Sequence, residues 1–167
     1  MFLTHQKLRR LYSISDDKQI GDNLVQEQNT KGKPNMCVSI LTSVVCGIII
    51  GLEREHRDKP AGIKTLALIC LGSTIFTIIS IMISSDYPSD RARIAAQVVT
   101  GIGFLGAGAI IRDGSTIVGL TTGATIWTTA AIGMLIGIGH PVYGVIISVA
   151  IVLLLTALRK IEKYLGR

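Results

Sequence analysis

The residues best suited to chemistry in this sequence are a few polar groups at the edges of apolar runs. Glu53, Arg54 and Glu55 follow the first apolar run, and Arg93 and Gln97 open a later one. Arg93 and Gln97 are four residues apart, so they share one face of a helix. Polar residues at membrane depth are functional candidates by default. The structural alternatives are a hydrogen bond between helices at Gln97 and interfacial anchoring at Glu53 and Arg93, because a buried amide must find partners inside the protein.

No set of residues with the spacing of an enzyme active site or a metal site is found. The three cysteines fall inside apolar runs without a CxxC pair, which is typical of small buried hydrophobic residues. The three histidines are scattered and lack zinc-like spacing. These residues are Cys37, Cys46, Cys70, His5, His56 and His140. We therefore expect neither an enzyme, a metal site nor a bound cofactor.

The segment 101–106 (GIGFLG) matches the GxGxxG pattern of dinucleotide-binding proteins. That chemistry requires a preceding strand and a following helix in a βαβ unit. Here the match lies midway along an apolar run, so helix packing or a locally distorted helix is the favoured interpretation.

The distribution of charge predicts a membrane protein. None of the 28 charged residues lies between Gly114 and Leu158, a run of 45 residues. As a helix this run would be about 68 Å long, more than twice the hydrocarbon thickness of about 30 Å. The run should therefore cross the membrane twice, with a break at Gly139-His140-Pro141.

We predict an all-α fold, a polytopic membrane bundle of about five transmembrane helices. The domain covers residues 36–160, between a polar N-terminal tail (1–35) and a short basic C-terminal tail (161–167). Proline at position 60 suits the first turn of the second helix, and Ser115 or Thr116 can cap the fourth. The predicted spans are 36–52, 63–84, 94–111, 115–137 and 142–158.

Small residues are repeated within three of these spans. Because lipid supplies little hydrophobic force between helices, close backbone approach must hold them together. The predicted contact pairs are Gly47/Gly51, Gly103/Ala107, Gly119/Gly123 and Gly133/Gly137. Thr122 and Thr129, seven residues apart, share a helix face and either bond backbone carbonyls or line a polar path, while Trp127 is interpreted as a packing residue.

The net charge of +6 comes from short basic clusters at the ends of apolar runs, where phospholipid head groups lie. No aromatic and basic interleaving is present, so nucleic acid is not an expected partner. With the N-terminus outside, nine Lys and Arg residues near the spans lie inside and five outside. If the Lys and Arg residues of the whole N-terminal tail are counted, the comparison narrows to nine inside against eight outside. We therefore expect a cytoplasmic C-terminus, with Glu53 and Arg93 at opposite faces of the membrane.

Three long segments resemble the signatures of the MgtC/SapB family, in the family's order. They are GLEREHRDKPAGIKTLALICLGS (51–73), RIAAQVVTGIGFLGAGAII (93–111) and VGLTTGATIWTTAAIGMLIGIGH (118–140). The resemblance spans roughly residues 36–160. By position, the motif residues carried over are Glu53, Arg54, Glu55, Lys59, Pro60, Gly62, Arg93, Gln97, Gly101, Gly103, Gly106 and Gly108.

The resemblance implies a bacterial inner-membrane protein linked to adaptation to low magnesium and to survival inside macrophages. It further implies a regulator that binds membrane partners, such as the ATP synthase or a transport ATPase, and the small-residue faces are compatible with a homo-oligomer. The alternative is a transporter or channel for an ion or small solute. Two departures from the family pattern limit which of the family's properties can be transferred to this chain. Lys64 and Leu66 stand where Arg and His are usual in the family, and the soluble C-terminal domain of the best-studied member has no counterpart within these residues.

Overall fold

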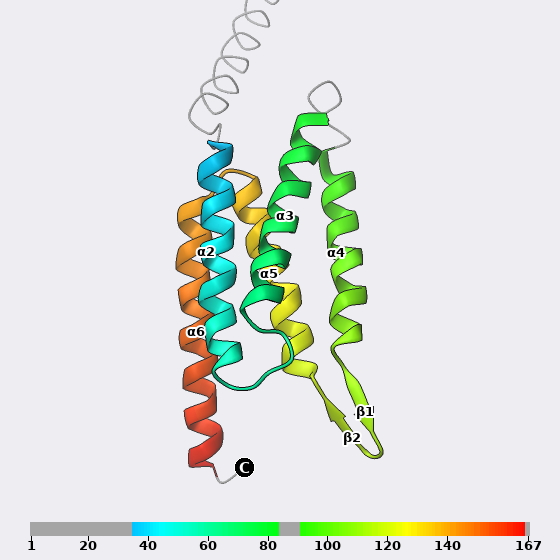
Figure 1. Ribbon diagram of the computed structural model, residues 1–167, viewed down its shortest axis with the longest axis vertical. Helices are drawn as coiled ribbons and strands as arrows, with labels where there is room; N and C mark the ends of the chain where they lie inside the picture. Colours follow the sequence, from blue (N-terminus) through cyan, green and yellow to red (C-terminus); the bar gives the residue numbers. More distant parts are fainter. Residues whose placement is uncertain (1–34, 84–90, 166–167) are drawn as a thin grey trace, which may run out of the picture. The chain divides into compact units, whose positions relative to one another are not determined.

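Each predicted apolar run folds into a helix, and the helices pack side by side (Figure 1). The computed structural model describes residues 35–83 and 91–165, so the predicted N-terminal tail lies, except for Asn35, outside the described residues. The elements are α2 (Met36–Glu55), α3 (Ile63–Ile83), α4 (Arg91–Gly108), β1 (Ile111–Asp113), β2 (Thr116–Val118), α5 (Leu120–Gly137) and α6 (Pro141–Tyr164). The predicted helical bundle is confirmed.

Four of these helices, α2, α3, α5 and α6, are long and apolar enough to cross a membrane. Helix α4 differs, because Arg91, Arg93 and Gln97 lie in its first two turns. It nevertheless runs alongside α3 and α5, with its start at the end of the bundle where α3 finishes (Figure 1). The bundle therefore contains one helix whose composition does not suit an all-lipid environment.

Successive helices run in opposite directions (Figure 1). The end of α2, the β-hairpin and the end of α6 consequently lie at one end of the bundle, and the start of α4 lies at the other. Glu53 and Arg93 are therefore at opposite ends, as predicted.

The connection between α4 and α5 corrects two predicted boundaries. Helix α4 ends at Gly108 instead of residue 111, and residues 111–118 form an antiparallel hairpin in which Asp113 pairs with Thr116. The β-branched side chains of this segment favour strands, and Gly114, at a φ of 60°, suits the tight two-residue turn. Neither Ser115 nor Thr116 caps α5, because the N-cap is Gly119 at a φ of 93°.

Other boundaries also differ from the prediction, and α4 begins at Arg91 instead of residue 94. Helices α2 and α6 continue past residues 52 and 158 to Glu55 and Tyr164, so part of the expected basic tail is helical. Charged side chains at these ends do not stop a helix, and Lys163 in the last turn of α6 complements the helix dipole. Pro60 lies in the loop before α3, not in its first turn. The predicted break before Pro141 is confirmed, since Pro141 opens α6.

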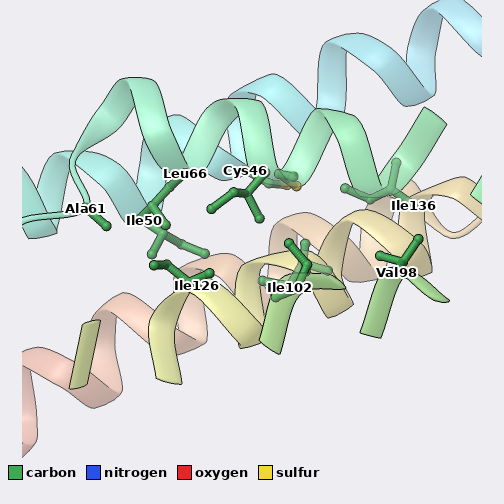
Figure 2. Close-up of a cluster of buried hydrophobic side chains, with 12 residues drawn as sticks. Cys46, Ile50, Ala61, Leu66, Val98, Ile102, Ile126 and Ile136 are labelled. Atoms are coloured by element: carbon green, nitrogen blue, oxygen red, sulfur yellow. The ribbon is translucent and has the colours of Figure 1, made fainter. Parts of the chain in front are cut away.

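The core lies where α2, α3, α4 and α5 meet (Figure 2). Figure 2 shows Ile50 and Leu66 near Ile126, with Ile102 and Val98 from α4 on the same side as α5. The fully buried side chains are modest in size: Ile50, Leu66, Ile132 and Ile136 lead in volume, followed by Thr, Cys and Ser. Close approach of helices, more than bulky side chains, therefore builds this core.

Glycines permit that close approach at two of the predicted pairs. A Cβ atom on Gly47 or Gly51 would overlap the backbone of α3, and one on Gly133 or Gly137 would overlap α3 as well. Gly123 packs on Gly106 of α4, but Gly119 lies outside the helix. The pair Gly103/Ala107 is exposed, so the predicted contact there is not made with any other described residue. Trp127 is 55% exposed and is not a packing residue either.

Candidate functional site

Three largely buried charged side chains lie at the end of α2 and in the turn that follows it: Glu53 and Arg54 in the helix and Arg57 in the turn, here together called the charged end of α2. Arg54 is 2% exposed, and the side chains of Glu53 and Arg57 are 6% and 15% exposed. Sequence analysis favoured interfacial anchoring for Glu53. Burial contradicts this, because α2 stays helical through Glu55 and turns these side chains toward α5 and α6.

Glu53 and Arg57 form an ion pair that faces α6. The Nε of Arg57 lies 2.7 Å from Oε1 of Glu53, four residues earlier on the same helical side. Arg57 also donates from Nη2 to the Thr156 hydroxyl at 3.2 Å and from Nη1 to the Leu155 carbonyl at 3.5 Å. This arginine therefore ties the end of α2 to α6. It was absent from the predicted site residues, although its spacing from Glu53 is a readable signal.

Arg54 points to a different neighbour. Its Nη2 donates to the hydroxyl of Thr122, in the first turn of α5, at 3.0 Å. Its Nε is buried and has no hydrogen-bond partner among the described residues. Thr122 was expected to share a face with Thr129, and both are buried. The contact between Thr122 and Arg54 has no signal in the sequence, because the two residues are 68 positions apart.

Glu55 organises the start of α3. Its Oε2 accepts a hydrogen bond from the backbone N–H of Ile63 at 2.9 Å, which satisfies a donor that the helix leaves free. A Cβ on Gly62 would come within 2.7 Å of that oxygen, so glycine leaves room for the carboxylate. Lys59 and Pro60 lie exposed in the intervening loop. The first-motif residues thus form one continuous structure around the α2–α3 turn.

The remaining predicted site residues lie along α4: Arg93 and Gln97 are near its start at the opposite end of the bundle, whereas Gly106 packs on Gly123, next to Thr122. Val98, Ile102 and Gly106 face the bundle at a spacing of four. The exposed side, here called the outer face of α4, comprises Arg93, Gln97, Thr100, Gly101, Gly103, Phe104 and Gly108. A hydrogen bond between helices was the structural alternative for Gln97, and the exposure of this residue speaks against it within the described residues. A Cβ added at Gly101, Gly103 or Gly108 would meet nothing within 4 Å.

Hydroxyl groups between α3 and α5 engage backbone carbonyls. Thr74 donates to Cys70 O at 2.9 Å and is also 2.8 Å from Gly133 O on α5. Thr125 and Thr129 donate to carbonyls one turn earlier in α5, each at 2.8 Å. The predicted alternatives for the threonine face were backbone bonding or a polar path, and these contacts favour backbone bonding.

The cysteines and acidic groups do not gather into a metal-binding arrangement in residues 35–83 and 91–165. Cys46 and Cys70 are buried as expected, whereas Cys37 is exposed. The GxGxxG segment lies wholly within α4, so it does not form the strand-to-helix turn of a dinucleotide site.

A family model decides the relationship of this chain to known proteins, since the model of the MgtC family matches residues 40–164. The chain belongs to the MgtC family. The match begins in α2 and ends at the last residue of α6, so it includes the charged end of α2 and the whole of α4. The resemblance found in the sequence is thereby confirmed.

Several curated proteins are similar to this chain. The chain is 50% identical over 122 residues to the putative magnesium transporter YhiD of Escherichia coli K12, covering 70% of this chain and 56% of that protein. It is 46% identical over 103 residues to protein MgtC of Salmonella typhimurium LT2, covering 62% and 43%. An uncharacterized Haemophilus influenzae protein is 40% identical over 136 residues, covering 77% and 57%. The chain thus spans about half the length of these relatives. No solved structure matches it.

Proposed function

We propose that this MgtC-family chain is a regulatory or accessory protein that acts through helix contacts with other membrane proteins during magnesium limitation and intracellular survival. Partners such as the ATP synthase or a transport ATPase follow from the family resemblance. The observation that supports contact-based action is the outer face of α4, which combines an exposed amide, a hydroxyl and three open glycines.

Such a face is poorly matched to lipid. In hydrocarbon, an amide without a hydrogen-bond partner costs several kcal/mol, and Gln97 has no partner among the described residues. Glycine in a helix interior also costs about 1 kcal/mol relative to alanine. Elsewhere in this bundle, Gly47, Gly51 and Gly133 compensate by letting another helix approach. A partner helix on α4 would do the same for Gly101 and Gly108 and would bond Gln97.

Site-specific photo-crosslinking tests this proposal in magnesium-limited cells. Phe104 is 82% exposed on the outer face of α4, so p-benzoylphenylalanine at this position should give discrete crosslinked species. Leu153, 65% exposed on α6, provides the matched control and should give none. If Phe104 and Leu153 behave alike, or if Phe104 crosslinks only to lipid, the proposed contact surface is wrong.

Genetic rescue tests whether this surface matters for function. A deletion strain under magnesium limitation should be rescued by the wild-type chain and not by Gln97→Leu, which removes the amide and keeps an exposed side chain of similar size. Phe104→Leu, on the same face but without a polar change, is the control that should rescue. Full rescue by Gln97→Leu would remove Gln97 from the functional residues.

We further infer a multi-pass location in the bacterial inner membrane with the end of α6 in the cytoplasm. The end of the bundle formed by the α2–α3 turn, the hairpin and the end of α6 carries exposed basic residues, which favour the cytoplasmic side. They include Lys59, Lys64, Arg112, Lys160 and Lys163. A reporter enzyme active only in the periplasm should be inactive when fused after Tyr164, and activity there would reverse this topology.

Transport of an ion or small solute is the second candidate. It is supported by the name of one relative, a putative magnesium transporter, and by the buried row of hydroxyls on α3 and α5, which includes Thr74, Thr77, Thr125 and Thr129. Their donors engage backbone carbonyls, but hydroxyl oxygens retain acceptor capacity for a cation. Purified chain in liposomes should then carry a magnesium or proton flux. Folded protein without flux for any tested ion excludes this candidate.

A further inference from the structure

Helix α6 extends past the other helices at the end of the bundle where the α2–α3 turn lies. Its 24 residues, Pro141–Tyr164, form a helix about 36 Å long, which exceeds the hydrocarbon thickness of about 30 Å. Figure 1 shows the last turns of α6 passing the α2–α3 turn and reaching the level of the hairpin. Residues 157–165, here called the α6 extension, are all exposed. The α6 extension therefore reaches the level of the lipid head groups.

One side of the α6 extension is apolar. This side continues the lipid-facing side of α6 at helical spacing. Its residues are Leu154, Leu158, Ile161 and Leu165, and all four are exposed. Tyr164 is 94% exposed, and an aromatic ring with a hydroxyl suits the boundary between hydrocarbon and water. A helix end that projected into water would leave this apolar side uncovered, so the α6 extension is better matched to the membrane surface.

The opposite side of the α6 extension is basic and continues the side of α6 that faces the bundle. Ser148 is buried on that side, and Thr156 accepts a hydrogen bond there from Arg57 of the α2–α3 turn. Arg159 and Lys163 follow Thr156 at spacings of three and seven residues. They therefore share the side of α6 from which Arg57 approaches.

Exposed positive charge exceeds exposed negative charge at this end of the bundle. The exposed basic side chains of the α2–α3 turn, the start of α3, the hairpin and the α6 extension are Lys59, Lys64, Arg112, Arg159, Lys160 and Lys163. Among the described side chains at this end, the exposed acidic ones are Glu55, Asp58 and Glu162. The Glu55 carboxylate already accepts a hydrogen bond from the Ile63 N–H. The charge excess attracts anions, and the neighbouring apolar side favours an anion that carries acyl chains.

We propose that the α6 extension and the α2–α3 turn bind the head groups of anionic phospholipids, such as phosphatidylglycerol. Guanidinium and ammonium groups bond phosphate oxygens, while the apolar side of the extension packs on the acyl chains of the same lipids. An acidic segment of a soluble protein would match the charges but leave the apolar side uncovered. This surface is separate from the outer face of α4, so the proposal does not depend on the function proposed for that face.

A single tryptophan in the α6 extension identifies the lipids around it. In the full purified chain, Trp127→Phe removes the only tryptophan of the sequence, and Tyr164→Trp introduces one in the extension. This parent protein is placed in nanodiscs of phosphatidylcholine and phosphatidylglycerol in which either lipid carries brominated acyl chains that quench tryptophan fluorescence. Each Lys or Arg near the surface favours an anionic lipid about fivefold. Brominated phosphatidylglycerol should therefore quench at least about twice as strongly as brominated phosphatidylcholine at the same mole fraction.

Charge variants connect this lipid preference to the α6 extension. Arg159→Gln combined with Lys163→Gln should abolish most of the difference between the two lipids. The matched control, Arg159→Lys combined with Lys163→Arg, keeps both charges and should preserve the difference. Glu162→Gln removes an acidic side chain from the same turns and should enlarge it. All three side chains are exposed, so the variants should unfold at the midpoint of the parent protein.

Several results would overturn the proposal. Equal quenching by the two brominated lipids in the parent protein would mean that the surface does not select anionic head groups. Quenching by aqueous acrylamide and by neither brominated lipid would place the α6 extension in water. Protection of the tryptophan from acrylamide by poly-glutamate, in place of a preference for phosphatidylglycerol, would assign the surface to an acidic protein. An unchanged preference in the variant with both glutamines would mean that other residues select the lipid.

Discussion

Replacing glycine by alanine at two positions should change stability in opposite directions. Gly133 of α5 lies against α3, where an added Cβ would overlap the Cys70 carbonyl oxygen and come within 2.9 Å of the Ser73 Cβ. Gly101 of α4 has nothing within 4 Å of the corresponding position. The two substitutions add the same methyl group to a helix interior, so their difference reports packing alone.

The magnitudes follow from the contacts. At Gly101 the methyl group meets no atom of the described residues within 4 Å, so the chain gains up to about 1 kcal/mol in helix propensity. At Gly133 the obstacle is backbone, which cannot rotate away, and overpacking costs about 1–3 kcal/mol. Separation of the helices would also stretch the bond from Thr74 Oγ1 to Gly133 O, now 2.8 Å and worth about 1 kcal/mol. We expect Gly133→Ala to lose about 2–3 kcal/mol net.

Equilibrium unfolding in detergent, followed by circular dichroism, measures both changes on the purified chain. The two variants should differ by about 2–4 kcal/mol in unfolding free energy, with the wild type between them. A Gly133→Ala protein as stable as the wild type would refute close α3–α5 packing at this residue. A Gly101→Ala protein that loses stability in the purified protomer would show that α4 packs against the bundle differently.

The same unfolding assay tests further substitutions at the α2–α3 turn and on the outer face of α4. Arg57→Leu should lower the free energy of unfolding by about 3 kcal/mol, because it leaves the Glu53 carboxylate buried and unpaired. Adding Glu53→Leu should restore much of this loss. Equal stability of the single and the double variant would contradict this prediction. Glu55→Ala should cost about 1 kcal/mol by freeing the Ile63 N–H, whereas Glu55→Gln, which keeps an acceptor oxygen, should cost less. Gln97→Leu should stay within about 0.5 kcal/mol of the wild type, since Gln97 is exposed and none of the described residues hydrogen-bonds its amide, and a larger loss would mean that the amide contacts the protein.

Much of the fold is readable from the sequence because charge marks where a chain leaves the membrane. The charge-free run and the Gly139–Pro141 break locate α5 and α6, and the glycine pairs of α2 and α5 identify two real contacts. The hairpin between α4 and α5 was missed. The β-branched residues of this hairpin are as apolar as those at the end of a membrane helix. Hydropathy alone therefore does not distinguish a hairpin from a helix end.

The direction in which each side chain points was less predictable, and this affected the site most. In a soluble helix the apolar stripe faces the core, but in a membrane both the lipid-facing and the protein-facing sides are apolar. Trp127 was therefore interpreted as a packing residue and is exposed, and Gln97, for which a hydrogen bond between helices was one alternative, is exposed as well. The burial of Arg54 depends on α5, which contributes Thr122 from a distant part of the chain.

The outer face of α4 differs in composition from the lipid-facing sides of the other helices. In this bundle the buried faces are built from small and hydroxyl-bearing residues, such as Gly133, Thr74 and Thr129, while large apolar side chains such as Leu153 point outward. The outer face of α4 has the composition of a buried face, with glycines, Thr100 and Gln97, yet no helix of the described chain covers it. Apart from Arg93 and Phe104, this face resembles the buried faces of the bundle, which supports the proposed contact with another membrane protein. The exposed amide is therefore better explained by a partner than by lipid, and its replacement by leucine should affect function without affecting the fold.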